Sequence, residues 1–211
     1  MDWTAMIGLG AYHGINPGMG WLFAVALGMQ ARSASAMWRA LPPLALGHLL
    51  AVGVVVAFVA GARVMLPFDL VRAVIAVTLV TLGIYRLWRH RHPRFGGMQV
   101  GFRDLTIWSF LMASAHGAGL MVVPFVIDTD DGVSALAATH ADHALTAMSS
   151  TAWTDALAVG LHSFSYIVVS AFLAWIVYRK LGVAFLRVAW FNLDWIWAGA
   201  LVVTGVLVVL S

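Results

Sequence analysis

The chain has 211 residues, of which 62% are hydrophobic and 10% are charged, and its formal net charge is +3. Soluble domains carry about a quarter charged residues. The composition therefore excludes an ordinary soluble enzyme or nucleic-acid-binding domain, and it indicates an integral membrane protein surrounded by the lipid bilayer. Cysteine is absent, which excludes disulfides, thiolate metal sites and thiol redox chemistry.

Apolar runs of about twenty residues recur along the chain, and each is long enough to cross a hydrocarbon core of ~30 Å. We predict six membrane-spanning helices at about 4–30, 42–62, 68–88, 105–127, 154–178 and 188–210. The expected fold class is an all-α polytopic membrane protein. It forms a single membrane domain over residues 1–211, with an outer loop at about 128–153.

Lysine and arginine are distributed unevenly between the two sides of the predicted bundle. The loops after the first, third and fifth spans hold ten of them, whereas the opposite side holds Arg63 and Arg72. Positively charged loops stay on the cytoplasmic side of a membrane. We therefore expect both termini to lie outside, and a bacterial inner membrane is the expected compartment.

The first predicted span is interrupted by polar and helix-disturbing residues, in the segment AYHGINPGMGW over residues 11–21. Pro17 removes a backbone donor, and the glycines permit close helix approach. Broken spans of this kind are tolerated where they line a cavity or are buried in protein. Asn16 follows His13 by three residues, so the two share a helix face. Asn16 could ligate the same ion as His13 or orient its ring.

The two halves of the chain resemble each other. The His-Gly pair of the first span recurs in the fourth, in AHGAGLM, where the histidine is His116. GHLLAVGVVVAF in the second span aligns without gaps with LHSFSYIVVSAF in the fifth, so that His48 falls on His162. Because three spans per copy is an odd number, the second copy must enter the membrane from the opposite side. We predict two inverted three-helix repeats, about 1–90 and about 105–211, with a site near the bilayer midplane.

The four span histidines are the candidate metal ligands. His13, His48, His116 and His162 each lie on the order of 10–17 Å from the nearer span end, hence near the membrane centre. They could serve as hydrogen-bonding contacts between helices. Four at repeat-related positions favour metal ligation, because neutral imidazole is the commonest protein metal ligand. The pattern does not distinguish Cu, Zn, Fe, Ni and Co, and haem held between two of the histidines is a further option.

Other polar residues could support this site. Ser163 and Tyr166 flank His162 and could hydrogen-bond its second nitrogen. Asp194 could be a proton-coupling group or an acceptor for a ligating histidine, or it could pair with an arginine near a helix end. The outer loop could capture cations or be an ordinary solvated acidic loop, and its candidate residues are Asp128, Asp130, Asp131, His140 and His143.

A six-span 3+3 layout with a Gly/Pro-broken polar motif in spans one and four resembles the lysine-exporter superfamily, which includes nickel/cobalt efflux proteins. The first-half motif of those carriers is similar to His-Ala-x-Asp-Ala-Asp-His. His13 matches its leading histidine and Asn16 its first aspartate, while Gly18 and Met19 stand in place of the remaining ligands. The resemblance implies a small-molecule or metal exporter, with His48, His116 and His162 replacing the missing ligands.

Three functions remain open on the sequence. The first is a transporter that moves a transition-metal cation, or a small solute around a bound metal. The second is a membrane metalloprotein that holds haem or a fixed metal for a redox or oxidase role, and the third is a proton-coupled exporter of a small solute without metal. The chain has no glutamate and no obvious general base at the histidines, which favours a transporter over an enzyme. Assembly into a homo-oligomer is compatible with all three.

Overall fold

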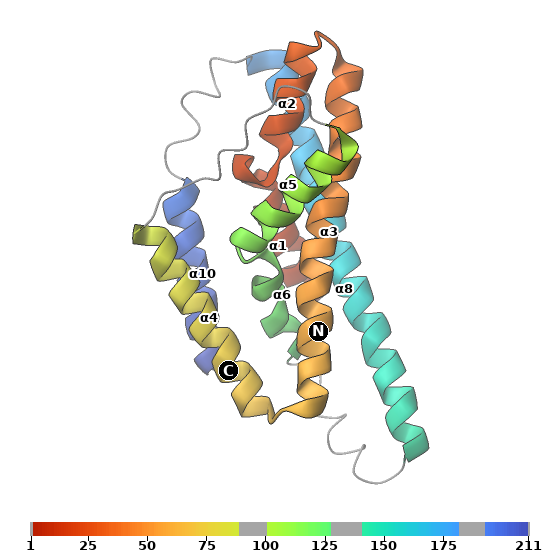
Figure 1. The fold of residues 1–211 in the computed structure, drawn as a ribbon, viewed down its shortest axis with the longest axis vertical. Helices are drawn as coiled ribbons and strands as arrows, with labels where there is room; N and C mark the ends of the chain where they lie inside the picture. The colour runs from red at the N-terminus through yellow and green to blue at the C-terminus, as the bar shows by residue number, and fades with distance from the viewer. Residues whose placement is uncertain (1, 89–100, 128–140, 182–192, 211) are drawn as a thin grey trace.

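The computed structural model describes residues 2–88, 101–127, 141–181 and 193–210. Every regular element within these ranges is a helix (Figure 1). The elements in chain order are α1 (Trp3–Ile15), η1 (Pro17–Met19), α2 (Trp21–Gln30), α3 (Ala34–Met65), α4 (Phe68–Trp88), α5 (Phe102–Ala115), α6 (Ala118–Ile127), α8 (Ala141–Ile176), η2 (Val177–Leu181) and α10 (Leu193–Leu210).

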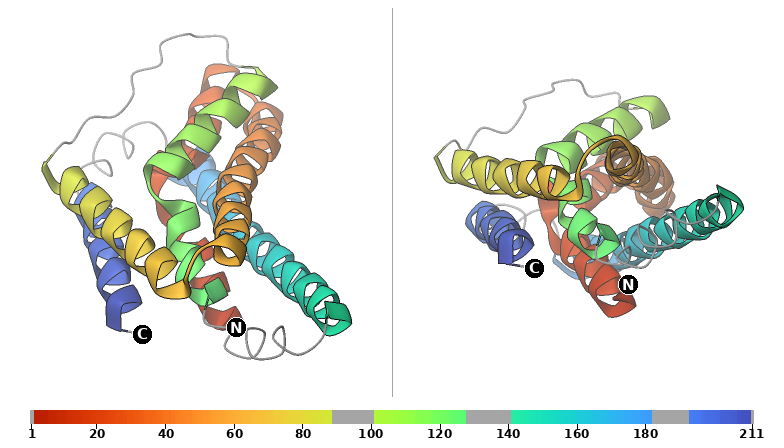
Figure 2. Two further views of the ribbon diagram at one scale, coloured as in Figure 1. Left: turned by 60° about the horizontal axis from the view of Figure 1, so that its bottom comes forward. Right: turned by 90° about the horizontal axis from the view of Figure 1, so that it is seen from below.

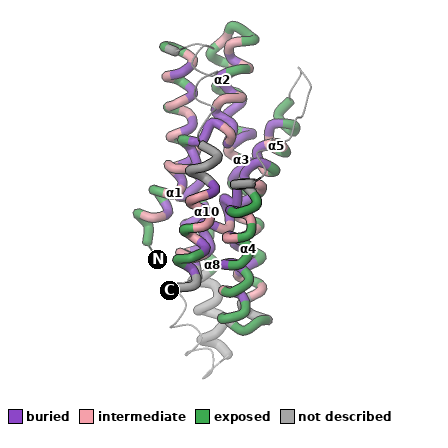
Figure 3. The backbone as a smooth tube through the Cα atoms, turned by 90° about the vertical axis from the view of Figure 1, so that its left-hand side faces the viewer, coloured by how far each residue is buried: buried purple, intermediate pink, exposed green. Residues whose placement is uncertain are grey.

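Helices long and apolar enough to cross a membrane are present in the described part of the chain. They cover Ala34–Ala62 and Ala152–Lys180, and the bent pair α5–α6 adds a third if it is taken as one span. Large apolar side chains point outward, with Phe58 75% and Trp153 73% exposed, and the exposed residues lie along the outer sides of the helices (Figure 3). Such surfaces suit lipid rather than water. The prediction of an all-helical chain with helices able to span a membrane is confirmed.

The first predicted span is broken, as its sequence indicates. α1 ends at Ile15 because Asn16 adopts an extended conformation (φ −67°, ψ 116°), which the residue before a proline favours. The Asn16 side-chain oxygen then accepts a hydrogen bond from the Gly18 N–H at 2.9 Å. Gly20 has φ +124°, a conformation that glycine adopts without strain, and the chain resumes as α2 at Trp21.

A second break separates α5 from α6. α5 ends at Ala115, α6 begins at Ala118, and the two helices form an angle of 60°. Gly117 lies between them with φ +70°. The His-Gly pairs of the first and fourth predicted spans are therefore both found next to an interruption of the helix.

Two predicted boundaries were wrong. α3 begins at Ala34 rather than at 42 and includes Pro42 and Pro43, since the segment before these prolines consists largely of good helix formers. α8 begins at Ala141 rather than at 154, so the helix extends into the segment at about 128–153 that we predicted as the outer loop. Alanine, leucine and methionine make this segment helical even though its polar residues end the apolar run.

The helices pack in three pairs: α1 lies along α8, α3 along α5, and α4 along α10. The last pair lies side by side at one edge of the molecule (Figure 2). Glycines allow the first two pairs to approach closely. A Cβ atom at Gly10 would collide with the carbonyl oxygen of His162, and one at Gly47 would collide with the carbonyl oxygen of Thr106. The candidate histidines lie where these two helix pairs meet.

Candidate functional site

The four span histidines come from four different segments and are all buried. His13 lies near the end of α1, His48 in α3, His116 directly after α5 and His162 in α8, and none is more than 1% exposed. The rings of His13, His48 and His162 form a triangle, with centroids 5.5 Å apart for the first two, 5.0 Å for His13 and His162, and 5.5 Å for His48 and His162. We refer to these three residues as the histidine cluster.

His48 and His162 face each other through the same ring nitrogen. Their Nε2 atoms are 3.3 Å apart, and the two ring planes differ by 12°. Because the centroids are 5.5 Å apart, the Nε2 atoms must point at each other almost along the line that joins the rings. One nitrogen of the pair can donate its proton to the other, and this fits two neutral imidazoles.

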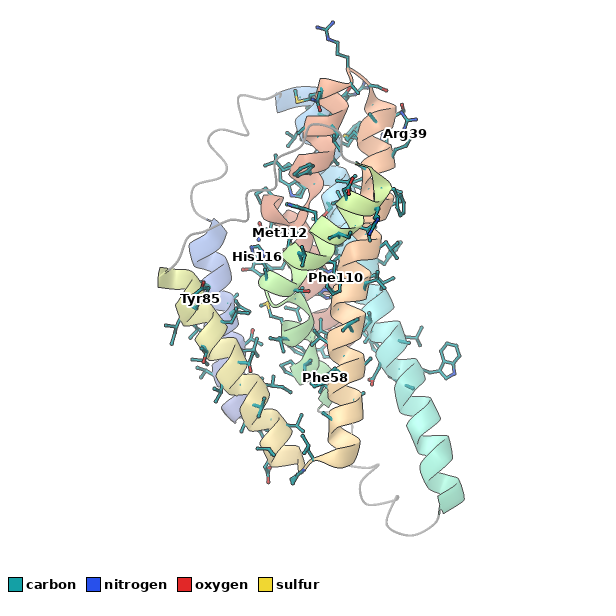
Figure 4. The ribbon with its side chains drawn as sticks, in the orientation of Figure 1. Arg39, Phe58, Tyr85, Phe110, Met112 and His116 are labelled. Carbon is teal, nitrogen blue, oxygen red and sulfur yellow. The ribbon has the colours of Figure 1, made fainter. Side chains whose placement is uncertain are left out.

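His13 and His116 are held in the same way by their own helices. The Nδ1 atom of His13 is 2.7 Å from the carbonyl oxygen of Leu9, and that of His116 is 2.7 Å from the carbonyl oxygen of Met112. Figure 4 labels the second of these pairs. A carbonyl oxygen only accepts, so Nδ1 carries the proton in both rings and Nε2 is the nitrogen with the lone pair. Metal-ligating histidines commonly have this arrangement.

His116 lies beside the first helix break and outside the triangle of the cluster. A Cβ atom added at Gly18 would be 4.0 Å from His116 Cε1. His116 therefore faces the backbone of η1, whereas the cluster rings face one another. The structure brings three of the four predicted ligands together and places the fourth beside them.

Tyr166 supports the cluster differently from what we expected. Its ring stacks on His48 with the centroids 3.9 Å apart and the planes 16° apart. Its hydroxyl donates to the carbonyl oxygen of Met19 at 2.6 Å, so the expected hydrogen bond to the second nitrogen of His162 is replaced by a bond to the first helix break. Tyr166 is fully buried and fixes one face of the His48 ring.

Several buried polar atoms around the cluster have no hydrogen-bond partner within the described residues. They are Nδ1 of His48, Nδ1 of His162, Nδ2 of Asn16 and Oγ of Ser163. A buried polar atom left unsatisfied costs about 1–3 kcal/mol, and such atoms usually have a water or ligand as partner. Ser163 is thus placed beside His162 as predicted, but its hydroxyl is not bonded to that ring.

Sequence reasoning missed one buried carboxylate. Asp155 in α8 is only 7% exposed. It precedes His162 by seven residues, which places both on one face of the helix. That spacing was the available signal, but Asp155 stands at the edge of the apolar run, where a solvated aspartate is the ordinary expectation.

The remaining predicted site residues lie outside the described part of the chain or have side chains that the structure does not describe. They are Asp194, Asp128, Asp130, Asp131, His140 and His143. Their predicted roles as proton-coupling group, histidine partner or cation-capturing loop stay predictions.

Among the described residues, no group of three or more His, Cys, Asp or Glu side chains is arranged to hold a metal ion as it stands. The Nε2 atoms of His48 and His162 point at each other instead of at a common centre. Comparison of the chain with protein-family models, curated proteins and solved structures gives no match.

Proposed function

We propose that the chain is a six-span membrane transporter that carries a transition-metal cation through the histidine cluster. The observation that carries the proposal is the triangle of three buried imidazoles, with centroids 5.0–5.5 Å apart. Imidazole nitrogens suit Zn, Cu, Fe and Ni. Their neutral form also permits an empty site in an apolar interior, where uncompensated charges would be costly.

The pairing of the helices supports two inverted repeats. In the predicted correspondence, the first span matches the fourth and the second matches the fifth. When each span is replaced by its counterpart in the other half, α1 corresponds to α5 and α8 corresponds to α3. The pair α1–α8 therefore corresponds to the pair α5–α3, and both pairs pack extensively. In the same way the His13–Leu9 hydrogen bond corresponds to the His116–Met112 bond, and both have the same length.

Transport, as distinct from fixed binding, is supported by the two helix breaks beside the histidines. Transporters with inverted repeats commonly place their substrate at discontinuous helices near the midplane. Here α1 ends two residues after His13, and α5 ends directly before His116. The pairs α1–α8 and α3–α5 also meet at the cluster, so a relative movement of the two pairs would change the ligands around a bound ion.

The arrangement of the chain ends supports the proposed orientation. Both termini lie in the lower half of Figure 1, whereas Arg39 lies toward the upper end in Figure 4. An even number of spans places both termini on one side of a membrane. With the arginine-bearing loops in the cytoplasm, both termini face outward.

A second candidate function has its own observation. The 3.3 Å contact between the Nε2 atoms of His48 and His162 is a hydrogen-bonding geometry that can pass a proton, which fits a proton-coupled exporter without metal. Haem is less well supported. His13 lies 5.0–5.5 Å from both rings of that pair, beside the gap across which a porphyrin would have to extend.

The test is uptake by the full-length protein in proteoliposomes that contain a metal-sensitive dye. We expect uptake of at least one of Cu, Zn, Ni or Co ions. The triple variant His13→Gln/His48→Gln/His162→Gln should lower uptake by at least ~10-fold, because loss of ligands costs more than loss of their supporting partners. The matched control is His90→Gln/His92→Gln, which changes two histidines of the predicted loop 3–4.

Three results would contradict the proposal. Equal uptake by the triple variant and the control would remove the cluster from the transport path. One tightly bound ion per chain without uptake would identify a fixed metal centre. Proton movement that requires the cluster but no metal would select the proton-coupled exporter.

A further inference from the structure

We infer that the preferred ion of the cluster is a monovalent d10 cation, Cu(I) or Ag(I), held in two-coordinate linear geometry between His48 and His162. This inference rests on the proposed metal site and specifies its substrate class. It follows from the directions of the two ring nitrogens, the absence of charged ligands among the described residues around them, and the restraint on the His48 ring.

The directions of the nitrogens distinguish linear from tetrahedral ligation. A tetrahedral ion needs lone pairs that converge at an angle, whereas the Nε2 atoms of His48 and His162 point at each other along the line joining their rings. Linear two-coordinate ligation is characteristic of monovalent d10 ions. It requires an ion on the line between two ligand atoms, and the two Nε2 atoms are aligned in this way.

The distance requires a small adjustment. Metal–imidazole bonds of about 2 Å on opposite sides of an ion place the two nitrogens about 4 Å apart. The present separation is 3.3 Å, so the rings must move apart by several tenths of an ångström. A tetrahedral ion would accept this separation, but it would require each ring to turn by tens of degrees out of its present line.

Tyr166 opposes a tilt of the His48 ring plane. The tyrosine ring lies on the face of His48, with centroids 3.9 Å apart, and is itself held by the hydrogen bond of its hydroxyl to Met19. Sliding His48 parallel to Tyr166 preserves the stack, whereas tilting it breaks the stack. The packing therefore permits the movement that a linear ion needs and resists convergence of the two lone pairs through a tilt of the His48 ring.

Charge favours a monovalent ion as well. The cluster consists of neutral imidazoles, and the described residues offer no carboxylate or thiolate that joins them in a metal-ligating group. The cost of burying an ion grows with the square of its charge, so a divalent ion with neutral ligands costs about four times as much to desolvate as a monovalent one. Zinc sites that lack such compensation usually keep a water or anion as a further ligand.

His13 gives the ion a route out of the pair. Its ring lies 5.0 Å from that of His162 and 5.5 Å from that of His48, and its Nδ1 proton is committed to the Leu9 carbonyl, so Nε2 is the ligating nitrogen. An approach of His13 makes the ion three-coordinate and lets one of the first two ligands leave. A low coordination number thus permits exchange without an uncoordinated ion in the membrane.

The test compares Ag⁺, as a redox-inert probe, with Zn²⁺ on the purified full-length protein. We expect one Ag⁺ per chain, with tighter binding than Zn²⁺, and X-ray absorption should show two nitrogen neighbours. His48→Gln and His162→Gln should each weaken Ag⁺ binding by at least ~100-fold, since each removes one of two ligands. His116→Gln is the matched control, because it changes an equally buried histidine outside the pair and should weaken binding by less than ~10-fold.

Other outcomes would overturn the inference and separate it from the proposed function. Tighter binding of Zn²⁺, with three or more nitrogen neighbours, would refute the linear site and leave a metal transporter in place. A loss in His116→Gln as large as in His48→Gln would show a site shared by all four histidines. Failure of the wild-type protein to bind either ion would remove both the inference and the metal-transport proposal.

Discussion

Replacing Gly10 by alanine tests whether the close contact between α1 and α8 positions the histidine cluster. The added Cβ would collide with the carbonyl oxygen of His162 and would lie 2.9 Å from Cβ of Ser165. Both contacts are shorter than real side chains tolerate, and the first involves backbone, which cannot rotate away. The two helices must therefore separate at the level where His13 faces His162.

The magnitude follows from a matched control on the same helix. Gly8 has nothing within 4 Å of an added Cβ, so Gly8→Ala carries only the gain in helix propensity, about 1 kcal/mol. Gly10→Ala carries the same gain together with an overpacking cost of about 1–3 kcal/mol. The two variants should therefore differ by about 1–3 kcal/mol, which corresponds to roughly 3–10 °C in apparent melting temperature for a chain of this size.

The assay is thermal unfolding in one detergent, followed by metal binding at a temperature where both variants are folded. We expect Gly10→Ala to melt below Gly8→Ala and to bind the metal at least ~10-fold more weakly, because a displacement of a ligand by about 1 Å is costly at a preorganised site. Equal melting temperatures would refute the close packing of α1 on α8. A lower melting temperature with unchanged binding would show that this contact does not position the site.

Two further predictions concern the support of the cluster and its orientation. Tyr166→Phe keeps the ring stack and removes the hydroxyl bond at the first break, so it should lower stability by about 1–3 kcal/mol through the unsatisfied carbonyl while metal is still bound. Loss of binding in equally folded Tyr166→Phe protein would refute this division of roles. Arg39→Cys and Asp2→Cys, both exposed and charged in the wild type, should react with an impermeant thiol reagent from opposite sides, Asp2→Cys from outside. Labelling of both from one side of intact cells would contradict the proposed topology.

The interruptions of the helices could be predicted from the sequence because their causes are local. A proline after Asn16 and a glycine after His116 act through the backbone of their own segments, whatever they pack against. The burial of the four histidines was also predictable, since an apolar run of this length leaves an ionisable residue few other places.

The contacts of the side chains could not be predicted in the same way. The spacing of Tyr166 and His162 suggested a bond within one helix, yet Tyr166 stacks on His48 from α3 and bonds to the first break. Partners on other helices depend on how the helices cross, which the pattern of a single segment does not determine. The start of α8 was missed for a related reason, because helix propensity extends the helix beyond the apolar run used to predict it.

The first helix break is secured by side-chain hydrogen bonds from three residues. Trp21 donates its indole N–H to the carbonyl oxygen of Ile15 at 3.1 Å, which joins α2 to α1 directly. Asn16 and Tyr166 add side-chain bonds to the same turn. The second break is closed by the backbone, through the Gly117 N–H on the Ser114 carbonyl at 3.0 Å, and by the His116 ring on Met112.

These bonds make α1–α2 a fixed elbow, while Gly117 lies at the joint between α5 and α6. Opening the elbow would cost three side-chain hydrogen bonds, whereas the second joint can change its angle by rotation around Gly117, whose φ of +70° is open to glycine in several neighbouring conformations. In the proposed transport cycle the two helix breaks would therefore act differently. The α1–α2 break would stay rigid and keep His13 in place, and the α5–α6 break would bend at Gly117.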